Sequence, residues 1–293
     1  MLELIGQAIF SGIAIGAVYA LASSGLGIIF GLFGVINFAH TQNLMLAAVA
    51  AFIAASFGLP YALACVIGIL AAAAFGAVTE RVFIRPLLEH DAVQVETLFI
   101  TLGLSIVLEN TTLLLFGSQP HYFVSPFPGV IDLGDIILTM DRVVTILAAA
   151  VVFSALYLLT KYSRFGKAAL ATAQNPNAAR VIGIPVDRVR LIAFAVGCGL
   201  AGLGGVLWGT TYSVSYLTGG NFLILSFVLV VMSGPGNING ILICSFLLGI
   251  TEGIAGAFFD PKWQRLAVML VFIVVILNRP NGLGQGKFAR TNN

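Results

Sequence analysis

Long apolar runs constrain this chain more than any other feature of its sequence. A helix needs about 20 apolar residues to cross the hydrocarbon core of a bilayer, and such runs recur along the 293 residues. The candidates are residues 5–30, 34–56, 60–82, 97–116, 142–160, 190–209, 222–233, 239–259 and 264–278. They lack the period-two alternation of strands in a lipid-facing barrel. We therefore predict an all-α, polytopic transmembrane helix bundle with eight to ten membrane segments.

The residue balance supports a chain that folds in lipid rather than in water. Apolar residues make up 59% of the sequence and charged residues 9%, against roughly 45–50% and about 25% in soluble domains. This balance excludes a cytosolic enzyme, a disordered protein and a basic protein that binds nucleic acid. We expect a single transmembrane domain over residues 1–293.

Basic residues between the runs set the expected orientation, because loops rich in Lys and Arg stay on the cytoplasmic side. Three such segments should face the cytoplasm: residues 81–96, 161–190 and 279–293. Segments 117–141 and 210–221 contain neither residue type and should face outward, whereas Lys262 and Arg265 oppose the rule. The N-terminus lies outside if all nine runs cross, and inside if one of the weaker runs is re-entrant.

Small residues recur four apart in three of the runs, which puts them on one face of each helix. The three sets are Ala8, Gly12, Gly16, Ala20 and Ser24; Gly197, Ala201 and Gly205; and Gly249, Gly253 and Ala257. Such faces let helix backbones approach closely in lipid, where packing drives association. We expect a compact bundle.

Segment 161–190 carries helix start and stop signals between two membrane runs. Asn175 is a good N-cap and Pro176 suits the first helical position, while Gly183 suits the residue after a helix end. The pattern predicts two short helices, about 166–173 and 176–182. Alanine, valine and isoleucine make this segment more apolar than a simple solvated loop, which is the alternative interpretation. A cytoplasmic helix with such a surface fits a groove in another protein.

Several motifs along the chain resemble permeases of the branched-chain amino acid ABC-importer family, most closely the first of its two paired permeases. They are Gly34–His40, Glu80-Arg81-x-x-Ile84-Arg85-Pro86-Leu87, Thr101–Ser105 with Glu109-Asn110, Gly166-Lys167-Ala168, Ala178-Ala179 with Gly183-Ile184, and Phe194 with Gly197, Leu200, Ala201, Gly202 and Gly205. Two segments depart from the family pattern: Thr41-Gln42-Asn43, and the turn Met232–Gly240.

This resemblance implies a permease subunit in a bacterial inner membrane that translocates branched-chain or related amino acids. Its partners would be ATP-binding-cassette ATPase subunits, a second permease subunit and a periplasmic solute-binding protein, with no nucleic acid and no cofactor. The coupling residues implied are Arg164, Gly166, Lys167, Ala178, Ala179, Arg180 and Gly183. Because the two departing segments are candidates for the pathway, urea or a short amide stays open as the solute.

Polar residues inside apolar runs mark the candidate translocation path, because they usually face the bundle interior or a water-filled route. They are Asn37, His40, Gln42, Asn43, Glu109, Asn110 and Glu252. The first four indicate a broken helix beside the path or, equally, a wet helix end at the cytoplasmic interface. The acidic residues could instead pair with each other, with His40 or with backbone donors. We expect Asp187 to cap the helix that follows it.

The sequence also lacks the motifs that other function classes need. No Gly-x-x-x-x-Gly-Lys-[Ser/Thr] loop occurs, so the chain has no evident means of cradling ATP phosphates, and the resemblance implies that a separate subunit hydrolyses ATP. No nucleophile set, paired carboxylates or metal cluster is evident, and the three cysteines lie in separate apolar runs, which argues against an enzyme. An ion-coupled secondary transporter remains the alternative.

The outer segment 117–141 carries a further prediction. Residues 130–139 should form a small hairpin, and the aromatic loop should either dock an external partner or cap the bundle.

Overall fold

The structure of the chain is a computed structural model. It describes residues 1–89, 94–123, 127–132, 134, 137–234, 236–280 and 282–283. The expectations for the cytoplasmic segments 81–96 and 279–293 and for the Met232–Gly240 turn therefore fall partly outside the described residues.

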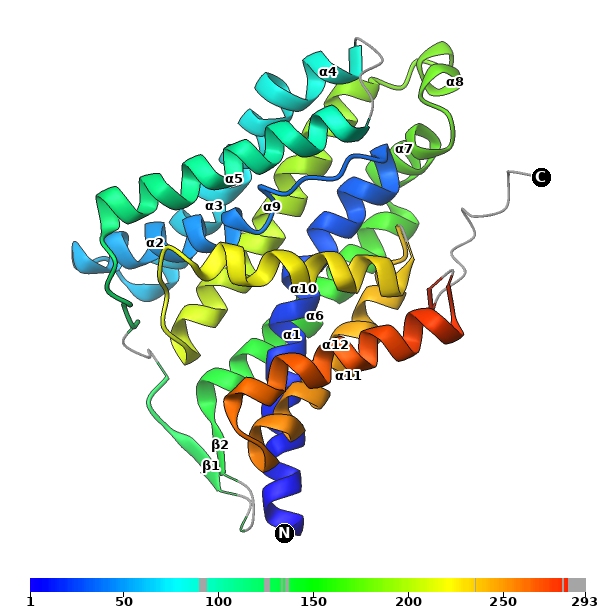
Figure 1. Cartoon of the computed structure of the whole chain (residues 1–293). Coiled ribbons are helices and arrows are strands. Elements are labelled where there is room, and N and C mark those ends of the chain that lie inside the picture. Colours follow the sequence, from blue (N-terminus) through cyan, green and yellow to red (C-terminus); the bar gives the residue numbers. More distant parts are fainter. Residues whose placement is uncertain are drawn as a thin grey trace.

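Helices make up nearly all of the described regular structure (Figure 1). In chain order the elements are α1 Leu2–Phe33, α2 Gln42–Ser56, α3 Tyr61–Thr79, the π-helical turn η1 Glu80–Ile84, α4 Arg85–Glu89, α5 Gln94–Phe116, β1 Val130–Asp132, β2 Ile137–Thr139, α6 Met140–Tyr162, α7 Arg164–Gln174, α8 Pro176–Val181, α9 Val186–Thr211, α10 Thr218–Ser233, α11 Ile238–Phe258 and α12 Pro261–Asn278. The expected all-α bundle is confirmed.

Not every apolar helix is long enough to cross a bilayer by itself. Among the described residues, six spans meet that length and hydropathy: α1, α3 continued through η1 and α4, α5, α6, α9 and α11. The shorter apolar helices are α2, α10 and the part of α12 from Trp263 to Asn278. The predicted run 34–56 is only partly helical, because the chain leaves α1 at Gly34 and enters α2 at Gln42.

The central helix α1 packs against α11 through glycines, as the small-residue faces predict. A Cβ atom added at Gly12 would lie 2.6 Å from the carbonyl oxygen of Gly249, and one at Gly16 would lie 2.9 Å from that of Ser245. On the facing helix, a Cβ at Gly253 would lie 2.8 Å from the amide nitrogen of Gly12. The two backbones are therefore in direct contact over several turns.

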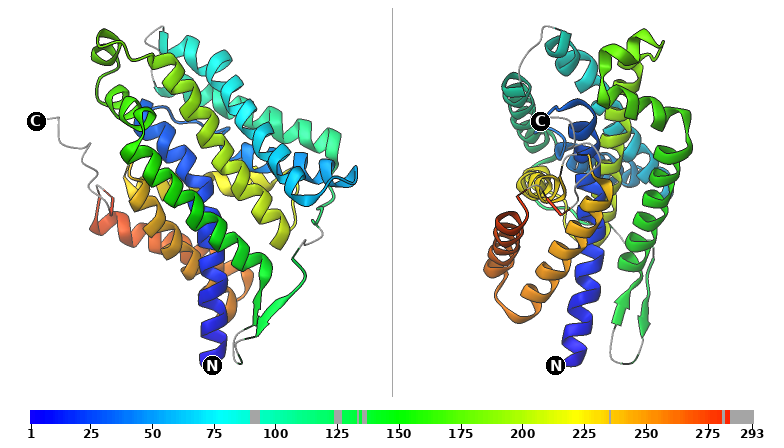
Figure 2. Two further views of the ribbon diagram at one scale, coloured as in Figure 1. Left: turned by 180° about the vertical axis from the view of Figure 1, so that it is seen from behind. Right: turned by 90° about the vertical axis from the view of Figure 1, so that its right-hand side faces the viewer.

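Helix α9 uses glycines to contact three other helices (Figure 2). A Cβ at Gly197 would meet the carbonyl oxygen of Gly25 in α1 at 3.0 Å, and one at Gly202 would meet the Ala72 side chain in α3 at 2.7 Å. A Cβ at Gly205 would lie 2.9 Å from Cα of Leu44 in α2. These contacts bury α9 and join α1, α2 and α3 into one packed group.

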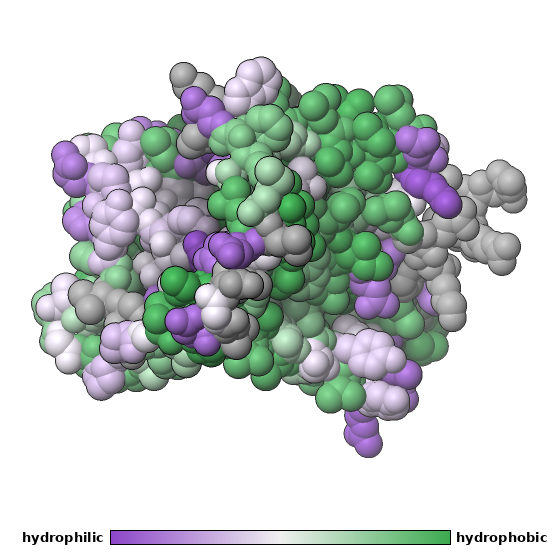
Figure 3. All heavy atoms as spheres, turned by 90° about the horizontal axis from the view of Figure 1, so that it is seen from below, coloured by the Kyte–Doolittle hydropathy of each residue, from purple (hydrophilic) through white to green (hydrophobic). Residues whose placement is uncertain are grey.

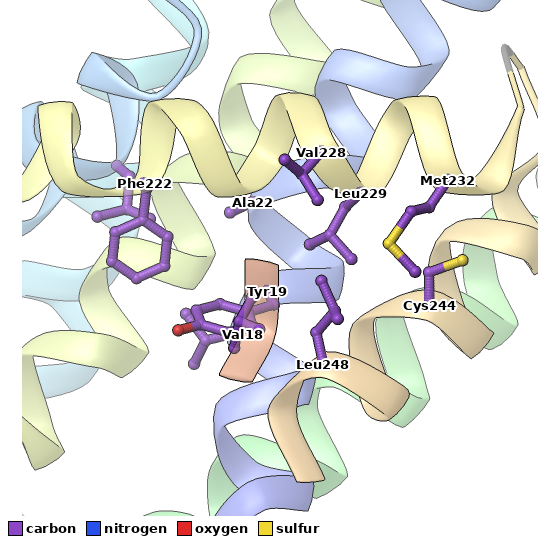
Figure 4. Close-up of a cluster of buried hydrophobic side chains, with 11 residues drawn as sticks. Val18, Tyr19, Ala22, Phe222, Val228, Leu229, Met232, Cys244 and Leu248 are labelled. Atoms are coloured by element: carbon purple, nitrogen blue, oxygen red, sulfur yellow. The ribbon is translucent and has the colours of Figure 1, made fainter. Parts of the chain in front are cut away.

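Helix α10 crosses over α1 and α11 and closes an apolar core (Figure 4). Leu229 and Met232 of α10 and Leu248 of α11 are fully buried there, beside Tyr19 of α1. In the turn to α11, Gly234 has a φ of 82°, a left-handed conformation that favours glycine. Asn237 then caps α11, because its Oδ1 accepts from the Gly240 amide at 3.0 Å.

The segments expected on opposite membrane sides lie at opposite ends of the bundle. Helices α4, α7 and α8 share one end, and the N-terminus and the β1–β2 hairpin share the other (Figure 1). The hairpin is antiparallel with Val130 opposite Thr139, which confirms the predicted strand pair. Beside it, His121 and Val214 exchange two backbone hydrogen bonds of 2.9 and 2.8 Å. These backbone hydrogen bonds tie the described part of segment 117–141 to the segment that follows α9.

Candidate functional site

The segment that links α1 to α2 is a buried polar turn inside the bundle. Gly34 ends α1 with a φ of 66° and donates its amide to Phe30 at 2.9 Å. The predicted path residues of this segment, Asn37, His40, Gln42 and Asn43, are all 0–1% exposed. The four polar side chains are thus enclosed by other residues of the bundle, which favours the broken-helix interpretation.

Side-chain hydrogen bonds hold this turn against three helices. The His40 Nε2 atom lies 3.1 Å from the carbonyl oxygen of Ala22, so Nε2 carries the proton, and Nδ1 faces the Cys198 thiol at 3.8 Å. Gln42 donates from Nε2 to the Ser105 hydroxyl at 3.0 Å. Asn43 donates to the carbonyl of His40 at 3.0 Å. These contacts of His40, Gln42 and Asn43 fix the conformation of the turn.

Some polar atoms of the same turn have no hydrogen-bond partner in the described structure. They are Asn37 Nδ2, Gln42 Oε1 and Asn43 Oδ1, together with the hydroxyl of Thr41. An unsatisfied buried polar group costs roughly 1–3 kcal/mol, so a native chain retains one only for a reason. The turn thus holds spare hydrogen-bonding capacity within the membrane region.

A large cavity lies at the opposite end of the bundle from α7 and α8. Its volume is about 720 Å³, and it opens between the middle of α1, the C-terminal parts of α9 and α11, and the starts of α10 and α12. Its polar lining includes Tyr19, Tyr212, Asn221, Glu252, Gln264 and Arg265. A neighbouring hollow of about 320 Å³ shares Trp208, Tyr212, Glu252 and Gln264 with it. Figure 3 looks onto this end, where hydrophilic side chains interrupt the hydrophobic surface.

We call the larger hollow the outer cavity, because it lies at the end of the bundle that the sequence predicts to face outward. Hydrogen bonds position its charged groups. The Tyr19 hydroxyl donates to Oε2 of Glu252, and in Figure 4 that hydroxyl lies on the side of the core away from Leu248. Arg265 donates from Nη2 to Oδ1 of Asn221 at 3.3 Å. Within the described part of the chain, no ion pair joins Glu252 to Arg265. The cavity therefore presents one anion and one cation that are each held by a neutral partner.

The predicted coupling helices form at the other end, close to their expected bounds. Asn175 Oδ1 accepts from the Ala178 amide at 2.9 Å and caps α8. Gly183 takes a φ of 85°, and the Ile184 amide returns to the carbonyl of Ala179 at 3.0 Å, which closes α8 with a Schellman motif. These local contacts make α8 a rigid projection.

The surface that α7 and α8 expose differs in part from the prediction. Arg164, Lys167, Ala178 and Arg180 are exposed, but Gly166 and Ala179 are buried against the bundle, with Ala179 only 2% exposed. Gly183 is exposed and serves the turn. Val181 and Ile182 are 87% and 73% exposed and supply the apolar surface available to a partner.

An ion-pair network fastens α8 to the bundle. Asp187 does not cap α9, because the helix already begins at Val186. It instead accepts from Arg85 at 2.9 Å, Arg190 at 3.2 Å and Arg180 at 3.4 Å. Arg190 also contacts Glu80 Oε1 through Nε at 2.6 Å, and both side chains are buried. The network joins η1, α4, α8 and α9, and sequence reasoning missed it.

The remaining predicted path residues lie on α5 and are not brought together with the others. Asn110 is exposed and donates to the carbonyl of Ile106 at 2.8 Å. Glu109 is half-buried, and a Cβ at Gly220 would lie 3.3 Å from its Oε2. In the described structure, neither residue hydrogen-bonds to Glu252 or His40. Glu109 therefore lies beside Gly220 at the edge of the outer cavity, which Gly220 lines.

Two cavity residues, Tyr19 and Arg265, were missed as functional candidates. Tyr19 looks like an ordinary core residue in an apolar run, since only folding reveals its Glu252 partner. Arg265 did carry a signal, because a cation at an outward-facing end opposes the positive-inside rule. Such an exception indicates a local partner for the charge.

Comparison with known proteins places the chain among transport permeases. A family model described as "Branched-chain amino acid transport system / permease component" matches residues 8–277. The high-affinity branched-chain amino acid transport system permease protein LivH of Escherichia coli (strain K12) is 31% identical over 94% of both chains. The corresponding protein BraD of Pseudomonas aeruginosa is 28% identical over the same shares. The fructose import permease protein FruG of Bifidobacterium longum is 22% identical over 77% of this chain and 69% of its own. No solved structure matches.

Proposed function

Because the chain belongs to the family of branched-chain amino acid transport system permease components, we propose that it forms part of the translocation path of an ATP-driven importer. The chain is a transport permease and not an enzyme. Its solutes are branched-chain or related amino acids, as the names of its relatives suggest. The observation that carries the proposal is the family match over nearly the whole chain.

The proposed topology has nine crossings within one domain, with the N-terminus outside and the C-terminus inside. The six long spans supply six of these crossings. The shorter apolar helices α2, α10 and α12 supply the other three, each together with the non-helical backbone next to it. Non-helical backbone at membrane depth is tolerated where protein buries it, as in the turn that contains Asn37 and His40. The chain then lies in the inner membrane of a bacterium.

The proposed ATPase contact is the exposed surface of α7 and α8. Val181 and Ile182 offer apolar side chains to a groove in the ATPase subunit, flanked by Arg164, Lys167 and Arg180. The caps of α8 and the Asp187 network hold this surface rigidly, so a displaced ATPase would move α9 as well. A second permease subunit and a periplasmic solute-binding protein complete the assembly.

The proposed path runs from the outer cavity towards the buried turn. Glu252 lines the cavity, Glu109 lies at its edge, and Asn37, Gln42 and Asn43 offer unsatisfied polar atoms deeper in the bundle. Polar groups along a route through apolar helices can replace part of the hydration that a solute loses on entry.

Co-purification and transport test this function together. The chain, expressed with ATPase, second permease and binding-protein subunits encoded in the same genome, should purify as a complex and take up leucine into proteoliposomes only with ATP. The double variant Val181→Asp/Ile182→Asp should lose the ATPase during purification. The matched control Val130→Asp, at an exposed site in the outer hairpin, should retain it. Uptake by the isolated chain under an ion gradient alone would contradict the proposal and favour a secondary transporter.

A further inference from the structure

The outer cavity combines opposite charges with an apolar wall. Glu252 reaches it from α11, and Arg265 reaches it from α12. Each charge is held in place by a neutral residue and not by the other charge, since Tyr19 bonds to Glu252 and Asn221 to Arg265. Glu252 is half-buried, where a charge without an opposite partner is costly, whereas Arg265 and Asn221 are exposed at the mouth of the cavity. A ligand that carries both charges would satisfy both.

Each charged group keeps bonding capacity for such a ligand. The Tyr19 hydrogen bond uses Oε2 of Glu252, so Oε1 can accept from a ligand ammonium. A guanidinium has five N–H donors in a planar fork that matches a carboxylate, and the described bond to Asn221 uses one of them. The amide nitrogen of Asn221 is a further donor on the same side of the cavity.

The apolar wall lies beside these charges. Phe222, Leu225, Val268 and Met269 line the cavity and belong to or pack against the buried core of α10 and α12. Trp208 contacts the Phe222 ring edge-to-face at a centroid distance of 5.0 Å and stacks on Tyr212 at 4.0 Å. This wall suits a branched or unbranched aliphatic side chain.

From this arrangement we infer that the outer cavity is a transit site for a zwitterionic amino acid with an apolar side chain. Arg265 and Asn221 hold its carboxylate, and Glu252 holds its ammonium group. The volume of about 720 Å³ is in the range of small-molecule sites, roughly 300–1,000 Å³. Urea and short amides carry no charge and would leave both protein charges unpaired. The inference rests on the proposed transport function and assigns solute contacts to the permease itself.

Site-directed labelling tests the inference without the binding protein. In the assembled importer in nanodiscs, Ser215→Cys places a thiol in the cavity lining, and a membrane-impermeant maleimide reports its accessibility. Leucine up to millimolar concentration should slow the labelling. Leucinamide, which lacks the carboxylate, and 4-methylpentanoate, which lacks the ammonium group, should each protect at least about tenfold more weakly. Urea should not protect.

Matched controls separate the site from general effects. Wild-type importer gives the background from Cys65, Cys198 and Cys244. A cysteine at Asp132, exposed in the hairpin and outside the cavity lining, should label at the same rate with and without leucine.

Charge-neutral variants then assign the two contacts. In the Ser215→Cys background, Glu252→Gln should abolish the advantage of leucine over 4-methylpentanoate, and Arg265→Gln should abolish its advantage over leucinamide. Equal protection by leucine and both analogues, or unchanged selectivity in these variants, would overturn the inference. So would a lack of protection in an importer that transports leucine with ATP, and the proposed function would then still stand. A complex that shows no ATP-dependent uptake would instead overturn the proposed function.

Discussion

Replacing Arg190 by methionine should destabilise the protein strongly, because it leaves the Glu80 carboxyl group buried without its charged partner. The Glu80 side chain is 1% exposed and that of Arg190 is 7% exposed. Oε1 of Glu80 contacts Nε of Arg190 at 2.6 Å, whereas Oε2 has no hydrogen-bond partner in the described structure. Without Arg190 the carboxylate has no compensating charge. Removing one partner of a buried ion pair typically costs about 3–5 kcal/mol of unfolding free energy.

Arg190→Met forms a double-mutant cycle with Glu80→Gln, and the other variants of this cycle have smaller expected effects on the free energy of unfolding. Glu80→Gln removes the anion but leaves Arg190 paired with Asp187 at 3.2 Å, so we expect a loss of about 1–3 kcal/mol. The double variant Glu80→Gln/Arg190→Met removes both charges and should be about 2 kcal/mol more stable than the sum of the two single effects. Arg188→Met changes an exposed arginine on the same helical turn and should stay within about 0.5 kcal/mol of wild type.

Unfolding free energies from a titration with sodium dodecyl sulfate in mixed micelles, followed by circular dichroism, measure all four variants. If Arg190→Met does not fold, Arg190→Lys provides the same test. A lysine ammonium is a point charge that cannot bridge Glu80 and Asp187 as a guanidinium does, so an intermediate loss is expected. Equal stabilities of Arg190→Met and Arg188→Met would refute the reasoning, as would strictly additive single effects.

Three further substitutions probe the helix contact, the cap and the polar turn. Gly249→Val should lower the thermal midpoint of the purified protein, because a Cβ there would lie 2.6 Å from Cα of Gly16, whereas Gly103→Ala, with open space around it, should not. Asn175→Ala should cost about 1 kcal/mol of local stability, seen as faster hydrogen exchange of the α8 amides without a change elsewhere. Gln42→Leu removes both the unsatisfied Oε1 and the buried hydrogen bond to Ser105, and these effects oppose each other, so the thermal midpoint should change little while ATP-dependent leucine uptake falls.

The sequence predicted best those features whose causes are local. The two coupling helices run from Arg164 to Gln174 and from Pro176 to Val181, close to the expected 166–173 and 176–182. Their boundaries depend on contacts that span five residues or fewer, such as the bond from Ala178 to Asn175. The small-residue faces were predicted for a similar reason, since spacing alone puts them on one side of a helix. The spacing did not show which of these helix faces would pack against each other.

Contacts between distant residues account for what the sequence did not reveal. Glu80 and Arg190 are separated by 110 positions, and each alone looks like an interfacial charge. Ala179 looks as available as Ala178, but the fold turns it inward. The burial of a residue and the side chain with which it pairs depend on tertiary packing, which a single sequence does not display.

The packing of α9 determines how the two ends of the bundle can communicate. Arg190 and Trp208 lie on this one helix, about 27 Å apart at 1.5 Å per residue. Glycines at 197, 202 and 205 bring the α9 backbone against α1, α3 and α2, so α9 cannot slide past them without steric overlap. We therefore expect a displacement of α8, acting through Arg180 and Asp187, to move these four helices together. The opposite wall of the outer cavity belongs to α10 and α12. We expect the cavity to widen or narrow when that wall moves relative to the four helices.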